Sequence, residues 1–213
     1  MSEFSGSERA ASSVLGVAML IGLTVIMVSI VALSVSSVYG LVSPGIAPQA
    51  KIVAIEAKGG LPPSVAFEDN TIKLKHKGGD SLDMGRTKII IYGKGRSYRP
   101  VFRGGYVPSY PNIGNLQVLY LNLTKHGKTA DYDATNKNLL KDGSWSTGEI
   151  LSLSGEDSLN SDDIRSSVLV FVDGDGETSN NYGFKAGENV YITLVDTLTN
   201  QIISSTSAVT AQE

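Results

Sequence analysis

The sequence contains no cysteine, which excludes a disulfide framework, a thiolate metal site and a cysteine nucleophile. Only two of its 213 residues are histidine, and His76 and His126 are too far apart along the chain for a short metal-binding motif. The sequence contains one tryptophan and 23 glycines, a composition typical of a turn-rich β domain. The formal net charge of −3 offers no basic surface for nucleic acid, so we expect no nucleic-acid partner.

Recognisable catalytic motifs are also missing: there is no G-x-S-x-G, no Walker loop and no dinucleotide-binding fingerprint. The acidic pairs Glu156-Asp157 and Asp162-Asp163 are typical of solvated turns. Residues 173–177 (DGDGE) invite a calcium interpretation, but Thr178 replaces the required glycine and Phe184 the required glutamate. We therefore expect no enzyme, cofactor or metal site, and interpret residues 173–177 as a turn between strands.

Charge is absent from one long segment of the chain. No charged residue occurs between Arg9 and Lys51, and residues 14–38 also lack His, Asn, Gln and Pro. As a helix, those residues would extend about 38 Å, more than the roughly 30 Å of a bilayer core. The pattern predicts a hydrophobic assembly or transmembrane helix over residues 11–40, preceded by ten mostly polar residues.

Small residues are scattered through this apolar segment. Gly16, Gly22, Thr24 and Ser29 would let neighbouring helices approach closely, which favours helix packing. Because such residues also occur in ordinary transmembrane helices, an uncleaved signal anchor with one transmembrane helix is the alternative. Pro44 and the residues around it predict a linker over residues 41–50.

The N-terminal sequence from Ser7 to Val35 (SERAASSVLGVAMLIGLTVIMVSIVALSV) resembles that of archaeal type IV pilins. In that family a basic and a small residue precede the bond cut by a prepilin peptidase. The resemblance implies that residues 1–10 are a prepilin leader, that Arg9 and Ala10 are the basic-small pair and that cleavage leaves Ala11 as the first residue.

Two further stretches resemble the same family. Residues 74–80 (LKHKGGD) resemble its His-x-Gly-Gly-Asp turn, and residues 186–190 (AGENV) resemble the start of its closing hairpin. Leu15 stands where bacterial type IV pilins usually carry Glu. In those pilins the Glu pairs with the new N-terminus of a neighbouring subunit, and this pairing cannot be transferred to the present sequence. Residues 15–19 also differ from the opening of archaellins, which favours a pilus over a swimming filament.

From residue 51 onward the apolar pattern changes to alternation, which predicts strands. In residues 71–77, Ile72 and Leu74 fall on one face and three lysines on the other. We predict an α+β chain with one long N-terminal hydrophobic α-helix, followed by an antiparallel immunoglobulin-like β-sandwich over residues 51–213. The expected strands are residues 51–56, 71–77, 88–92, 116–123, 149–151, 167–172, 189–196 and 202–209. Residues 125–163 otherwise read as polar and irregular.

Two surface features are candidate contact or modification sites. Residues 97–111 are rich in tyrosine and arginine, which suits contact with sugars or neighbouring subunits. An exposed loop with one or two rings folded onto the sheet is the alternative. The residues concerned are Tyr98, Arg99, Arg103, Tyr106 and Tyr110. Asn122 begins an Asn-Leu-Thr glycosylation sequon.

The resemblance implies a structural subunit of an extracellular type IV pilus-like filament, with its helix in the filament core and its β domain outward. Its partners would be copies of itself, the prepilin peptidase and the assembly machinery, and its precursor would reside in the cytoplasmic membrane. Surface adhesion is the role that the family implies. The alternatives are a single-pass anchored binding protein that uses residues 97–111 and a membrane-tethered hydrolase.

Overall fold

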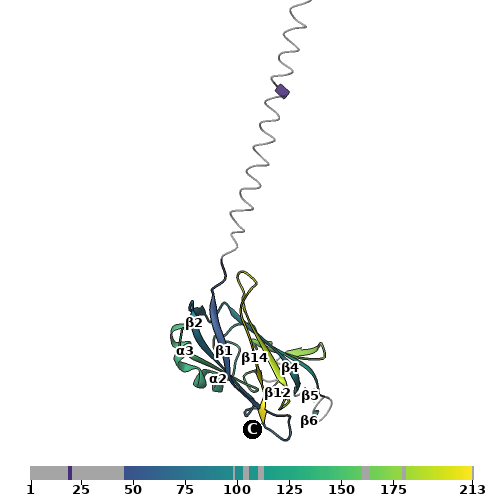
Figure 1. Ribbon diagram of the computed structural model, residues 1–213. Helices are drawn as coiled ribbons and strands as arrows, with labels where there is room; N and C mark the ends of the chain where they lie inside the picture. Colours follow the sequence, from purple (N-terminus) through teal and green to yellow (C-terminus); the bar gives the residue numbers. More distant parts are fainter. Residues whose placement is uncertain are drawn as a thin grey trace, which may run out of the picture. The chain divides into compact units, whose positions relative to one another are not determined.

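The computed structural model describes residues 19–20, 46–97, 99–102, 106–109, 113–159, 164–178 and 181–212 (Figure 1). The chain divides into two compact units, Met1–Gly45 and Ile46–Glu213. Of the first unit only Met19 and Leu20 are described, and both are helical and exposed. The second unit is a β-rich domain.

The predicted α+β class with a long N-terminal hydrophobic helix is wrong for the structure as described. Strands predominate in the described part of the chain, and the helices α2 (Ala130–Thr135) and α3 (Lys137–Asp142) have only six residues each. Within the described ranges no helix has the length and apolar character needed to span a membrane, so the transmembrane and pilin-helix predictions are corrected too. Apart from Met19 and Leu20, the segment that suggested them lies outside the described residues.

Two main sheets form the domain. The smaller has the order β15-β1-β2-β9, and its strands β1 and β2 are antiparallel. Its members are β1 (Ala50–Gly59), β2 (Thr71–Gly79), β9 (Ile150–Ser154) and β15 (Ala211–Gln212). In β2 the burial alternates as predicted, with Ile72 and Leu74 buried and the lysines between them more exposed. Period-2 alternation therefore identifies this strand and its inner face.

The larger sheet has the order β11-β10-β7-β4-β13-β14, and β12 also pairs with β4. Its strands are β4 (Thr87–Ser97), β7 (Gly114–Tyr120), β10 (Val168–Val172), β11 (Asp175–Thr178), β12 (Tyr182–Phe184), β13 (Asn189–Asp196) and β14 (Gln201–Val209). Two further two-stranded sheets pair β3 (Leu82–Asp83) with β8 (Ser144–Trp145), and β5 (Arg99–Phe102) with β6 (Tyr106–Ser109).

One hydrophobic core lies between the two main sheets. Buried side chains of the smaller sheet, such as Leu74 and Leu151, belong to the same cluster as Ile91, Val118 and Ile192 of the larger sheet. Burial of large aliphatic side chains stabilises such a core by about 1.5–3 kcal/mol each. The arrangement is a β-sandwich, and a β-rich domain is consistent with the prediction from sequence.

Side-chain hydroxyls join the two sheets at one edge. The backbone N–H of Ile52 donates to Ser204 Oγ at 3.3 Å, and that of Ala54 donates to Thr206 Oγ1 at 3.4 Å. After β14 the chain continues into β15, which pairs in parallel with the end of β1 at Lys58. Ala211 and Gln212 therefore cover the last two residues of the edge of β1, and covering a strand edge limits edge-to-edge aggregation.

The acidic segment after β10 turns at its first two residues only, whereas the sequence predicts a turn over residues 173–177; residues 175–177 belong to strand β11. Asp173 and Gly174 both have positive φ, 53° and 80°, and link β10 to β11. Two positive φ values between antiparallel strands define the tight turn that matches strand twist. The Asp173 carboxylate accepts hydrogen bonds from the backbone and side-chain amides of Asn115, each at 2.9 Å.

Candidate functional site

A turn at the end of β2 fastens the first residues of the β domain. The Asp80 carboxylate accepts from the Gln49 backbone N–H at 2.9 Å, and the Asp80 N–H donates to the Gln49 carbonyl at 2.8 Å. Gly79 has φ of 98°, and a Cβ there would collide with the Gln49 carbonyl. Glycine is therefore required by both conformation and space. We call residues 49 and 76–80 the N-terminal clamp.

His76 supports this clamp from the interior. Its Nε2 lies 2.9 Å from the Asp80 carbonyl oxygen, which can only accept, so Nε2 carries the proton. Nδ1 faces Thr147 Oγ1 at 3.4 Å, and the ring packs edge-on against Trp145 with centroids 6.0 Å apart. The buried histidine thus has partners on both nitrogens and a structural role in holding the turn.

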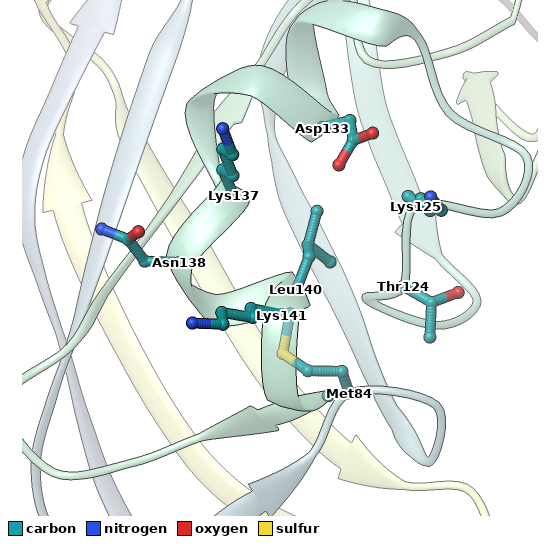
Figure 2. A pocket seen from close by; sticks show the side chains of 9 residues that line it. Met84, Thr124, Lys125, Asp133, Lys137, Asn138, Leu140 and Lys141 are labelled. Carbon is teal, nitrogen blue, oxygen red and sulfur yellow. The ribbon is translucent and has the colours of Figure 1, made fainter.

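A hollow with a cationic rim lies beside α2 and α3 (Figure 2). Its volume is about 650 Å³, within the range of roughly 300–1,000 Å³ typical of ligand sites. We call it the lysine pocket. It is lined by Met84, Thr124, Lys125, Asp133, Lys137, Asn138, Leu140, Lys141 and Gly143.

Local geometry brings the walls of the lysine pocket together. Lys137 and Lys141 are four residues apart on α3 and therefore share one side of the helix. Lys125 stands on the opposite wall, and Leu140 points into the space between (Figure 2). The backbone of buried Met84 links the walls, because its N–H donates to the Gly143 carbonyl and its carbonyl accepts from Leu123 N–H.

An acidic surface lies on the other side of α2, around a hollow of about 360 Å³. Its exposed and half-buried carboxylates are Glu68, Asp131 and Glu156, and buried Asp157 also lines the hollow. We call the first three residues the acidic surface. Burial raises the pKa of Glu156, and the neighbouring charges of Glu68, Asp131 and Asp69 raise it further.

A buried polar network underlies this surface. Tyr120 Oη donates to Asp157 Oδ2 at 2.7 Å and lies 2.7 Å from Tyr182 Oη. Asp157 Oδ2 also accepts from the Ser154 N–H at 2.8 Å. Burial raises the pKa of Asp157 to about 7, although these hydrogen bonds and the charge of Lys128 oppose the shift. Burial likewise raises the pKa of Tyr120 and Tyr182 well above the usual value.

Lys128 is the buried cation of the network. Its Nζ donates to Ser167 Oγ at 2.7 Å, to the Thr124 carbonyl at 2.8 Å and to Asn122 Oδ1 at 3.4 Å. These three contacts use all the donors of an ammonium group. Burial lowers the pKa of Lys128 to about 8, a shift opposed by the charge of Asp157. The partners identify a structural ammonium rather than a free nucleophile.

The sequon lies between this network and the lysine pocket. Asn122 is half-buried, and its Oδ1 accepts from the N–H and Oγ1 of Thr124 at 3.1 and 2.8 Å, as well as from Lys128. Thr124 itself lines the lysine pocket. Glycosylation of Asn122 stays a prediction.

The other predicted sites are only partly described. Of the tyrosine- and arginine-rich segment, Arg99 and Tyr106 lie in the β5–β6 hairpin, where Arg99 pairs with Ser109 and Tyr106 with Phe102. Tyr98, Arg103 and Tyr110 lie outside the described residues. The same holds for the predicted processing residues Arg9, Ala10 and Ala11, and for the predicted packing residues Gly16, Gly22, Thr24 and Ser29.

The lysine pocket and the acidic surface were not predicted from the sequence. The only available signal is the four-residue spacing of Lys137 and Lys141, which has meaning only once α3 is known. Across the described ranges, no group of three or more His, Asp or Glu side chains is arranged to hold a metal ion.

Comparison with known proteins gives one relative to report. No protein-family profile matches the chain. Over 117 residues the chain is 26% identical to an uncharacterized protein of Archaeoglobus fulgidus, and the match covers 54% of this chain and 74% of that protein. The chain is therefore similar to an archaeal protein whose description states no activity.

Proposed function

We propose that the protein is a structural subunit of an extracellular type IV pilus-like filament and that its β-sandwich is the outward domain. The supporting sequence features are the Arg9-Ala10 pair and the uncharged apolar segment that follows it. Prepilin peptidase and the assembly machinery would be the processing partners, and the precursor would start at the cytoplasmic membrane. Adhesion to surfaces is the role that we attach to the filament.

The N-terminal clamp is the observation that carries this proposal. Three positions of the His-x-Gly-Gly-Asp stretch that resembles the pilin turn have a physical task there: His76 supports the turn, Gly79 permits it and Asp80 binds Gln49. These contacts fasten the point where the linker meets the domain. A subunit built into a filament through its N-terminal segment must transmit load through that junction. The hydrogen bonds of the clamp would strengthen the junction against such load.

The experiment is to shear the cell surface and collect the sedimentable material. We expect the chain to be enriched in that fraction and antibody against the β domain to decorate thin filaments in electron micrographs. A chain found only in membranes, with no decorated filaments, would contradict the proposal and favour an anchored binding protein. An abundant membrane protein of known location serves as the control for contamination.

A further inference from the structure

The lysine pocket carries positive charge that the domain itself does not neutralise. Lys125, Lys137 and Lys141 are exposed, and none forms an ion pair with any residue that the structure describes. Among the described residues of the lining Asp133 is the one carboxylate, so their formal charge is three positive against one negative. In a chain with net charge −3 this local excess of cations marks a surface suited to an anionic partner.

The acidic surface has the opposite imbalance. Glu68, Asp131 and Glu156 form no ion pair within the described part of the chain. Lys73 lines the same hollow, but its Nζ is paired with Glu56 Oε1 at 2.9 Å. Burial raises the pKa of Glu156, and the neighbouring charges of Glu68 and Asp131 raise it further because like charges repel one another. Approach of external ammonium groups would relieve this repulsion.

The two charged surfaces lie on different sides of α2. Asp131 and Thr135 line the acidic hollow, whereas Asp133 lines the lysine pocket. Residues two positions apart on a helix point about 200° apart, which explains the separation. A copy whose lysine pocket is occupied therefore still presents its acidic surface to another copy.

We propose that the lysine pocket of one copy binds the acidic surface of a second copy, so that Lys125, Lys137 and Lys141 face Glu68, Asp131 and Glu156. Charge complementarity identifies a second copy of this chain as the partner of the lysine pocket, since the chain itself carries the matching anionic surface. The lysine side chains are exposed on flexible stems, and can reach carboxylates at the rim of a hollow. The contact joins two different surfaces, and head-to-tail contacts of this kind build open helical filaments when the rotation between copies does not close a ring.

This inference rests on the proposed filament and adds a contact between β domains to it. Because the charged groups are near the surface, the contact should weaken as salt screens them. Raising NaCl from about 0.05 to 1 M shortens the screening length several-fold. We expect filaments of the full chain to release subunits at the higher concentration.

The decisive test uses two charge-reversed variants of the full chain, expressed separately and together. One variant combines Lys137→Glu with Lys141→Glu, and the other combines Glu68→Lys with Asp131→Lys. When either variant is expressed alone, the pocket of one copy faces a surface of the same charge on the next copy. We therefore expect its sedimentable filaments to fall about tenfold. In cells that express both, every pocket meets an oppositely charged surface, so filaments should return to at least half of the original amount.

The matched control combines Lys51→Glu with Lys94→Glu, which makes the same change in charge at exposed lysines outside both the pocket and the N-terminal clamp. We expect control filaments to equal those of the unsubstituted protein. All four residues in the two test variants are exposed, and an unchanged thermal midpoint for each variant verifies folding.

Three results would overturn the inference. The first is that the reversed variants sediment like the control, and the second is that folded variants do not recover filaments when expressed together. The third is that filaments persist while a pocket variant loses its binding to alginate. The last result would assign the pocket to an acidic polysaccharide. Absence of filaments from the unsubstituted protein would instead refute the proposed function itself, so the two failures are distinguishable.

Discussion

Asp157→Asn is expected to remove most of the dependence of stability on pH between about pH 4 and 7. In the folded protein the pKa of Asp157 is raised by burial to about 7, against 3.8 for an ordinary aspartate. Below the lower value the carboxyl is protonated in both states and no penalty arises. As pH rises, the unfolded chain loses its proton first, so folding becomes progressively less favourable.

The size of this effect follows from the shift in pKa. About three pH units correspond to roughly 4 kcal/mol of stability lost between pH 4 and 8. Lys128 stays mainly protonated over the lower part of this window, since its folded pKa is about 8. Glu156 shifts in the same direction as Asp157 and adds to the loss. Asparagine cannot ionise, so the variant should lose no more than about 1 kcal/mol over the same range.

Urea unfolding at intervals from pH 4 to 8 measures this difference. Asp133→Asn is the matched control, because Asp133 lies outside the buried network and lines the lysine pocket instead. The control should keep the slope of the unsubstituted protein. Stability of the unsubstituted protein that stays level or rises across the window would refute the raised pKa of Asp157.

Asn136→Ala is expected to lower the free energy of unfolding by about 2–4 kcal/mol. The buried amide of Asn136 takes the place of a neighbouring strand at the free edge of β9. Its Nδ2 donates to the Ser152 carbonyl at 2.8 Å, and its Oδ1 accepts from the Ser152 N–H at 2.9 Å. Alanine would leave both backbone groups without a partner, and each such loss costs about 1–3 kcal/mol.

The exposed Asn138, two residues along on α3, offers a matched control. Asn138→Ala makes the same chemical change without touching β9, so its effect should stay within about 0.5 kcal/mol. Chemical denaturation of both variants at one pH gives the comparison. Equal stabilities for the two variants would show that the amide does not support the strand edge.

The strands were predictable because their signal is local. In β2 the alternation of Ile72 and Leu74 with lysines fixes both the conformation and the buried face. The helices α2 and α3 were missed because each buries a single large side chain, Tyr132 or Leu139, and therefore shows no apolar stripe. The apolar run of residues 14–38 predicted a helix that the described chain does not contain.

Contacts between distant residues could not be predicted. Asn136 reaches Ser152, and Lys125 faces Lys137 and Lys141 only after α2 and α3 have turned the chain. The resemblance to the pilin turn pointed to residues 76–80 of the N-terminal clamp. It did not reveal Gln49, which is 31 residues away from Asp80 in the sequence. Sequence patterns reveal which residues are buried and which form turns. The site depends instead on which turns and helices lie next to one another in the folded domain.

The N-terminal residue of the protein in sheared filaments tests the central claim most directly. Edman degradation or mass spectrometry of the sedimented chain should find Ala11 as the first residue, because a prepilin peptidase would cut after Ala10. An Arg9→Ala variant should keep its leader and be absent from the filaments. A chain that still begins at Met1 or Ser2, recovered only from membranes, would contradict the account of this protein as a processed filament subunit.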